Sequence, residues 1–69
     1  PDPGYAVVDI FDILGRRVQT LLSRDIAAGQ TEIQWDGTNS SGGSVASGIY
    51  LCKLEMNGQK QLRKMILAR

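Results

Sequence analysis

The 69-residue chain has no histidine and only one cysteine, Cys52, and these two scarcities exclude several kinds of chemistry. Histidine is the usual general base near neutral pH and the commonest transition-metal ligand, so its absence removes both roles. One cysteine cannot form an internal disulfide, and no histidine is present to activate the thiol of Cys52. We therefore expect no catalysis, no cofactor and no metal site, and we expect Cys52 to pack as a small apolar side chain.

An excess of charge and a long apolar run are missing as well. Eight basic and seven acidic residues leave a net charge of +1, which gives no electrostatic reason to expect binding to nucleic acid. No apolar run approaches the ~20 residues that a membrane-spanning helix needs, so no membrane insertion is expected. A chain of this length forms one small domain that buries only about 60% of its unfolded surface. Such a core leaves no room for an enclosed substrate cavity.

The alternation of apolar and polar residues predicts an all-β domain over residues 6–69, preceded by a short linker or N-terminal arm over residues 1–5. Strands are expected at Ala6–Ile13, Val18–Leu22, Thr31–Trp35, Ile49–Met56 and Gln59–Leu67. About five strands with short turns favour an antiparallel β-sandwich of Greek-key or meander type. A short helix over residues 16–26 is the alternative for the second strand, because Leu21, Leu22 and Ile26 also fall at helical spacing.

Three dipeptides or tripeptides mark expected turns: Leu14-Gly15-Arg16, Asp36-Gly37 and Asn57-Gly58. Asn-Gly between two apolar runs is the strongest of them, because a type I′ turn needs positive φ at both positions. Residues 23–29 are expected to form a loop that ends at Gly29. The polar, glycine-rich loop Thr38–Ser44 has no apolar side chain, so we expect it to be the most mobile part of the domain.

The expected core consists of the inward-facing residues of these strands, namely Val8, Ile10, Ile33, Trp35, Tyr50, Cys52 and Leu54. Trp35 and Tyr50 flank the central loop and are expected to be its aromatic anchors. Tyr50 stands two residues before Cys52 and just after Ser47-Gly48, the local pattern of a tyrosine corner. In that motif the hydroxyl forms a hydrogen bond with backbone a few residues upstream.

Other residues that suggest chemistry have simpler explanations. Asp9 and Asp12 lie three apart on a strand, hence on opposite faces, so they cannot act as a carboxylate pair. The oxygens of Asp36, Asn39 and Ser41 are compatible with calcium, but their spacing does not fit an EF-hand and favours an Asx turn. The basic residues along the chain are expected to protect strand ends and edges from unwanted pairing.

The order and spacing of several short motifs resemble one family of bacterial domains, and the resemblance covers residues 6–69. These motifs are Asp12-Ile13-Leu14-Gly15-Arg16-Arg17-Val18, Ala28-Gly29, Trp35-Asp36-Gly37, Gly42, Val45, Ser47-Gly48-Ile49-Tyr50 and Lys64-Met65-Ile66-Leu67. They resemble the Ig-like domain named after the flagellar hook-capping protein and the related type IX secretion sorting domain. The resemblance implies a small Ig-like, fibronectin III-like sandwich. The first strand of that sandwich is expected to be missing, since only residues 1–5 precede the first expected strand.

By the same resemblance, the chain is expected to be a non-catalytic C-terminal module of a secreted or cell-surface bacterial protein, acting as a sorting tag, an anchor or a structural unit. Its last strand, with Lys64, Met65, Ile66 and Leu67, is then the expected sorting or interaction strand. Two alternatives remain: a subunit of an extracellular filament that assembles by strand addition, and a carbohydrate-binding accessory module. Expected partners are an upstream parent domain or a neighbouring subunit at an open sheet edge, and the secretion machinery. The competing expectation is a monomer with a frayed edge.

Overall fold

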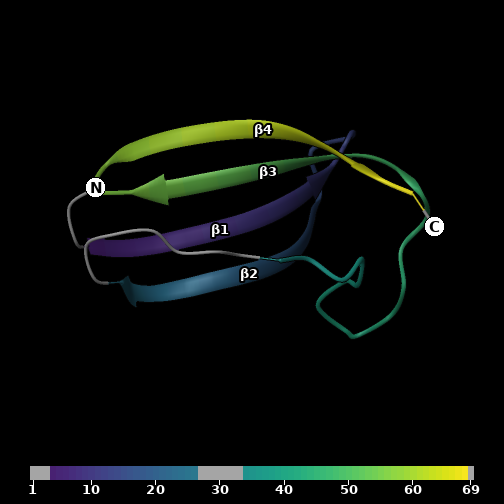
Figure 1. The fold of residues 1–69 in the computed structure, drawn as a ribbon, viewed down its shortest axis with the longest axis horizontal. Helices are drawn as coiled ribbons and strands as arrows, with labels where there is room; N and C mark the ends of the chain where they lie inside the picture. The colour runs from purple at the N-terminus through teal and green to yellow at the C-terminus, as the bar shows by residue number, and fades with distance from the viewer. Residues whose placement is uncertain (1–3, 27–33, 69) are drawn as a thin grey trace.

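The computed structural model describes residues 4–26 and 34–68, and within them the chain forms four β-strands and no helix (Figure 1). The strands are β1 (Gly4–Asp12), β2 (Arg17–Ile26), β3 (Gly48–Met56) and β4 (Gln59–Leu67). Among the described residues there is consequently no helix of the length and apolarity that crossing a membrane requires. The all-β class predicted from the sequence is confirmed.

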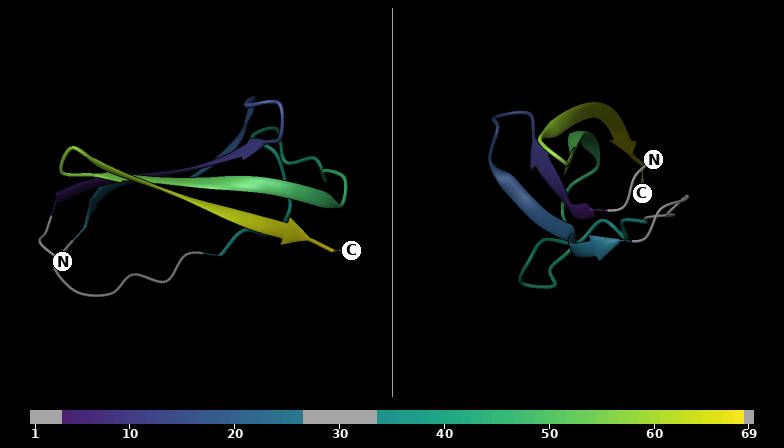
Figure 2. Two further views of the ribbon diagram at one scale, coloured as in Figure 1. Left: turned by 90° about the horizontal axis from the view of Figure 1, so that it is seen from above. Right: turned by 90° about the vertical axis from the view of Figure 1, so that its left-hand side faces the viewer.

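The four strands form one antiparallel sheet in the order β2-β1-β3-β4 (Figure 1). Two hairpins, β1–β2 and β3–β4, lie side by side because β1 pairs with β3 over residues 6–12 and 50–56. Figure 2 shows the twist of this sheet from two further directions. The sheet is open, with β2 and β4 at its edges, and corresponds to a fragment of a small Ig-like sandwich.

One face of the sheet carries the core. Ala6, Val8 and Ile10 of β1 are at most 3% exposed, and the residues paired with them from β3 are Met56, Leu54 and Cys52. Paired residues of antiparallel strands point to the same side, so these six side chains form one apolar layer. The opposite face is more polar but holds Asp9, which is 7% exposed and accepts a hydrogen bond from the Thr20 hydroxyl at 2.6 Å.

The second strand is longer than predicted, and two expectations about this region are wrong. Residues 17–26 form β2, which excludes the alternative of a helix over residues 16–26. Residues 23–26 belong to the same strand and are not part of a loop, because Ser23 to Ile26 pair with Val7 to Gly4 of β1. Pairing with the buried central strand therefore outweighs the helical spacing of the leucines.

Two further expectations are affected by the ends of the described segments. Within residues 1–5, Gly4 and Tyr5 are already part of β1. The strand predicted at 31–35 lies mostly outside the described residues, and its last two, Gln34 and Trp35, have no strand pairing. The described residues therefore contain four of the five expected strands.

Both hairpin turns follow from local chemistry. Asn57 and Gly58 have φ angles of 52° and 77°, the positive values that the predicted type I′ turn needs. In the β1–β2 turn, Asp12 Oδ1 accepts hydrogen bonds from the amides of Leu14 and Arg16, and Oδ2 pairs with Arg16 Nε at 2.8 Å. Gly15 supplies the positive φ, 84°. The carboxylate of Asp12 thus holds the turn closed.

These contacts make the β1–β2 turn sensitive to acid. The hydrogen bond from the Arg16 amide lowers the pKa of Asp12 below its usual value of 3.8, opposed by partial desolvation and aided by the Arg16 side chain and the Leu14 amide. Because the pKa of Asp12 is lower in the folded state than in the unfolded state, its carboxylate stabilises the fold at pH values above the unfolded-state pKa. This stabilisation is lost as the pH falls through the folded-state pKa. We expect the stability of the Asp12→Asn variant to be independent of this titration, so that it falls less in acid than the stability of the parent. Parallel acid titrations followed by circular dichroism measure the difference; identical acid profiles would contradict the prediction.

Candidate functional site

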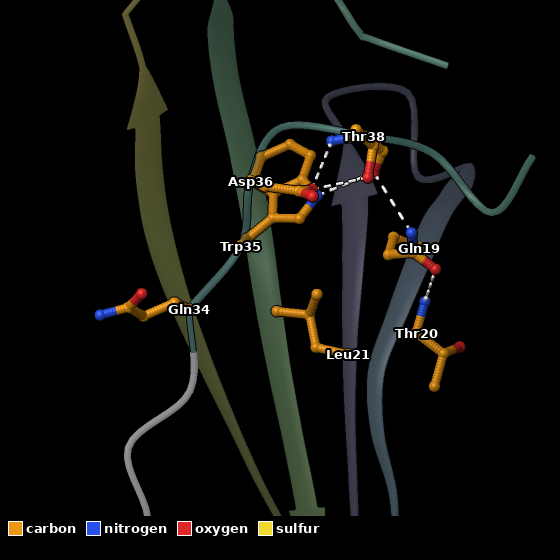
Figure 3. A pocket seen from close by; sticks show the side chains of 7 residues that line it. All are labelled: Gln19, Thr20, Leu21, Gln34, Trp35, Asp36 and Thr38. Atoms are coloured by element: carbon orange, nitrogen blue, oxygen red, sulfur yellow. Dashed lines mark hydrogen bonds between the residues drawn. The ribbon is translucent and has the colours of Figure 1, made fainter. Parts of the chain in front are cut away.

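The chain folds back onto the core face at Trp35, which contacts Tyr50 at one end of β3. The two rings are T-shaped, with centroids 5.0 Å apart and an interplanar angle of 70°. The indole Nε1 donates a hydrogen bond to the Thr38 carbonyl oxygen at 2.8 Å (Figure 3). Tyr50 is 7% exposed, whereas Trp35 is half-buried. The tryptophan is therefore an anchor at the margin of the core.

Tyr50 is held from the other side by its own hydroxyl. The hydroxyl donates a hydrogen bond to the Ala46 carbonyl oxygen, four residues upstream, at 2.6 Å. This is the bond that the tyrosine-corner pattern predicts. Gly48 between them has φ of 155°, a value that L side chains rarely adopt. The corner joins the segment before β3 to the core through one buried aromatic residue.

The loop after Trp35 is built from two Asx turns. Asp36 Oδ1 accepts from both the amide and the hydroxyl of Thr38, at 3.2 and 2.6 Å. Asn39 Oδ1 accepts from the amides of Ser41 and Gly43, each at 3.0 Å. Two of the oxygens considered for calcium are thus bound by the chain's own donors. In the described part of the chain, no cluster of three acidic or cysteine side chains has the geometry to hold a metal ion.

The loop is also attached to the edge strand β2, a contact that sequence reasoning missed. Ser40 N donates to the Val18 carbonyl oxygen at 3.0 Å, and Gln19 Nε2 donates to the Asn39 carbonyl oxygen at 2.9 Å. An isolated bridge between Thr38 and Ser44 closes the loop. A glutamine in an amphipathic strand has the sequence appearance of an ordinary solvent-facing residue, so no local signal indicated its role.

An open cavity of about 420 Å³ lies between this loop and β2 (Figure 3). Its lining residues are Gln19, Thr20, Leu21, Gln34, Trp35, Asp36 and Thr38. The indole N–H of Trp35 and the amide of Gln19 both donate to the Thr38 carbonyl oxygen, and Asp36 accepts from Thr38. The polar groups of Gln19, Trp35, Asp36 and Thr38 are therefore hydrogen-bonded to one another within the corner. The arrangement stabilises the fold and offers no acid, base or nucleophile in a reactive pairing.

The predicted interaction strand lies at the free edge of the described sheet. In β4, Lys64 and Ile66 point to the face opposite the core, with Ile66 73% exposed, while Met65 and Leu67 are half-buried on the core side. Leu62, on the same outer face as Ile66, is 66% exposed. This edge therefore presents both backbone and apolar side chains to solvent among the residues that the structure describes.

The residues expected in the core occupy three kinds of position. Val8, Ile10 and Tyr50 are buried; Trp35, Cys52 and Leu54 are half-buried; and Ile33 lies outside the described residues. Burial raises the pKa of the Cys52 thiol, with Asp9 adding to the rise and Arg63 opposing it, so the thiol stays protonated at neutral pH. The predicted turn residues Gly15, Asp36, Gly37, Asn57 and Gly58 all lie in turns or loops.

An open antiparallel sheet with a tyrosine corner is the architecture of a small Ig-like β-domain. The family model of the FlgD Ig-like domain matches residues 4–60, and the chain belongs to this family. The match spans β1 to β3 and ends at the second residue of β4. Searches among curated proteins and among solved structures found no match.

Proposed function

We propose that the chain is a non-catalytic C-terminal module of a secreted or cell-surface bacterial protein, where it serves as a sorting or anchoring tag. The observation that carries the proposal is the position of the C-terminal strand. β4 lies at an edge of the sheet and exposes Leu62 and Ile66 on its outer face. A recognition element needs such accessibility, and the fold provides it without opening the core.

Family membership supports the structural part of this proposal. The matching family is an Ig-like domain, and the polar groups of the Trp35 corner are hydrogen-bonded to one another. The sorting role and the extracellular location rest on the resemblance of the Lys64-Met65-Ile66-Leu67 segment to type IX sorting domains. The secretion machinery is the partner that this role requires.

The test is a secretion assay on a reporter fused ahead of the domain in a host with a type IX system. Deleting residues 64–69 should retain the reporter inside the cell. Because the deletion also removes the β-partners of Gly48 to Leu51, it must be accompanied by a full-length variant. The double variant Lys64→Glu, Ile66→Thr keeps the strand and changes only its exposed face. If the reporter fused to this variant stays inside the cell, the cause is lost recognition rather than unfolding.

The matched control is Ser40→Ala in the loop. The Ser40 side chain is exposed, and the hydrogen bond from its backbone N–H to the Val18 carbonyl oxygen is unaffected by the change. The expected result is reporter in the medium for the parent and the control, and cell-associated reporter for the deletion and the double variant. Undiminished secretion of the deletion would remove the sorting role and leave only a structural module.

A second role, assembly into a filament or complex by strand addition, is favoured by the same open edge. An unpaired strand edge is a template for a strand from another chain. We therefore propose that an upstream parent domain or a neighbouring subunit pairs with this sheet. The mass of the 69-residue chain in solution distinguishes the two partners: a monomer at high concentration excludes copies of the chain, and oligomers support them.

A further inference from the structure

The two edges of the sheet differ in regularity. β2 pairs with β1 through two register shifts, and its edge already contacts the chain's own loop through Ser40 and Gln19. β4 pairs with β3 in an unbroken register from Gln59 opposite Met56 to Leu67 opposite Gly48. Bulges, covering loops and charged side chains all protect an edge from pairing, and within the described residues β4 has only the third of these, its basic side chains, which do not repel a strand of opposite charge. An incoming strand is therefore directed to β4.

Charge on β4 has one sign. The strand contains Lys60, Arg63 and Lys64 and no acidic residue, and none of the three forms an ion pair with another described residue. Glu55 lies opposite Lys60 on β3 and offsets part of its charge, but Leu51 and Cys52 lie opposite Lys64 and Arg63. The positive charge in the second half of β4 is thus available to a partner.

The exposed face of β4 combines this charge with apolar area. Side chains alternate across a strand, so Leu62, Lys64 and Ile66 stand in a row on the outer face. Leu62 and Ile66 are 66% and 73% exposed, and Ile49, opposite Ile66, is 47% exposed. Lys53, opposite Leu62, is placed over the Phe11 ring with Nζ 5.2 Å from the centroid. The row presents a cation between two apolar side chains.

We propose that the free edge of β4 binds an extended segment of a partner protein that carries apolar, acidic and apolar residues at alternate positions. This inference rests on the proposed function, in which β4 is the recognition strand, and it specifies the chemistry of the partner that β4 binds. Backbone hydrogen bonds to the edge supply affinity, and the acidic residue opposite Lys64 supplies selectivity. Because the row Leu62, Lys64, Ile66 reads the same in both directions, the same segment fits in parallel or antiparallel orientation.

A second copy of the chain is a poorer occupant of this edge. Pairing β4 with β4 of another copy brings together two strands whose charged residues are all basic. Like charges directly opposite each other are destabilising. β2 of another copy contains two basic residues, Arg17 and Arg24, and one acidic residue, Asp25, and the loop contacts its edge at Val18 and Gln19. Charge complementarity therefore selects an acidic partner.

The experiment uses the 69-residue chain and a fluorescent nine-residue peptide with valine, glutamate and valine at alternate central positions and threonine elsewhere. A second peptide has lysine in place of glutamate, and a third has N-methyl groups that block backbone pairing along one edge. Binding is followed by fluorescence anisotropy, and the site by amide hydrogen exchange. We expect the glutamate peptide to bind at least fivefold more tightly than the lysine peptide, to protect β4 amides and not β2 amides, and to lose binding on N-methylation.

Charge reversal at the two edges provides the matched variants. Lys64→Glu on β4 should reverse the peptide preference by about fivefold, whereas Arg24→Glu on β2, an exposed residue of the other edge, should leave it unchanged. Circular dichroism checks that both variants fold. Absence of binding by either peptide, an unchanged preference in Lys64→Glu, protection at β2, or self-association through β4 would each overturn the inference.

The outcome is separable from that of the proposed function. If the deletion of residues 64–69 and the folded Lys64→Glu, Ile66→Thr variant both retain the reporter while no peptide binds, the acidic strand is rejected and the sorting role is kept. Peptide binding together with normal secretion of that deletion keeps the binding edge and rejects the sorting role.

Discussion

Replacing Ile10 with alanine is expected to remove most of the stability of this domain. Ile10 is 0% exposed, lies on the central strand β1, and is paired with Cys52 of β3 and Gln19 of β2. Truncating a buried isoleucine costs about 2–5 kcal/mol, because the site loses both transfer free energy and packing around the cavity. A domain of this length has roughly 3–10 kcal/mol in total. Urea denaturation followed by circular dichroism measures the loss.

The matched control is Ile66→Ala, the same chemical change at a side chain that is 73% exposed on the outer face of β4. Surface substitutions of this kind usually change the free energy of unfolding by less than about 0.5 kcal/mol. The urea midpoint of Ile66→Ala should therefore stay near that of the parent while that of Ile10→Ala falls sharply. Equal shifts in the two variants would show that the two faces of the sheet have been assigned wrongly.

The second large effect is expected for Trp35→Ala. Full truncation of a buried aromatic residue costs ~3–5 kcal/mol, and the half-buried position of Trp35 places the expected loss near the lower end of that range. The variant loses the T-shaped contact with Tyr50 and the bond from Nε1 to the Thr38 carbonyl oxygen. It should be largely unfolded well below the melting temperature of the parent, as monitored by far-ultraviolet circular dichroism.

Trp35→Phe separates the two contributions to this effect. Phenylalanine can keep a ring against Tyr50 but has no N–H for Thr38, so the variant should melt between the parent and Trp35→Ala. If Trp35→Ala melted like the parent, the corner would be an accessory to the sheet and its anchoring role would be refuted. If Trp35→Phe melted like Trp35→Ala, the hydrogen bond would dominate over the ring contact.

The local features of this protein were determined by its sequence alone. Asn57-Gly58 specifies the β3–β4 turn because few other residue pairs accept positive φ at both positions. The strand predicted at 59–67 has the bounds observed for β4. The alternation in residues 6–10 predicted the buried face of β1, and Ser-Gly-x-Tyr predicted the bond of the Tyr50 hydroxyl to upstream backbone. Each of these depends on residues close together in the chain.

Other features depended on contacts between residues far apart in the chain, which no local pattern encodes. Residues 17–26 have both helical and extended spacing, and pairing with β1 decided in favour of a strand that runs four residues beyond its predicted end. The burial of Asp9 became acceptable only because Thr20 is placed opposite to donate to it. The attachment of the 38–44 loop likewise needs Gln19, about twenty residues away.

The proposed binding edge illustrates the same division. The sequence shows that residues 59–67 are basic and amphipathic, and composition alone assigned their cations to protecting a strand edge. Only the order β2-β1-β3-β4 and the loop bound to β2 make the two edges unequal, with β4 the regular and accessible one. The sequence therefore determines the side-chain chemistry of each strand. Which strand lies at an unpaired edge is determined by pairing between residues far apart in the chain, and these contacts form only when the sheet forms.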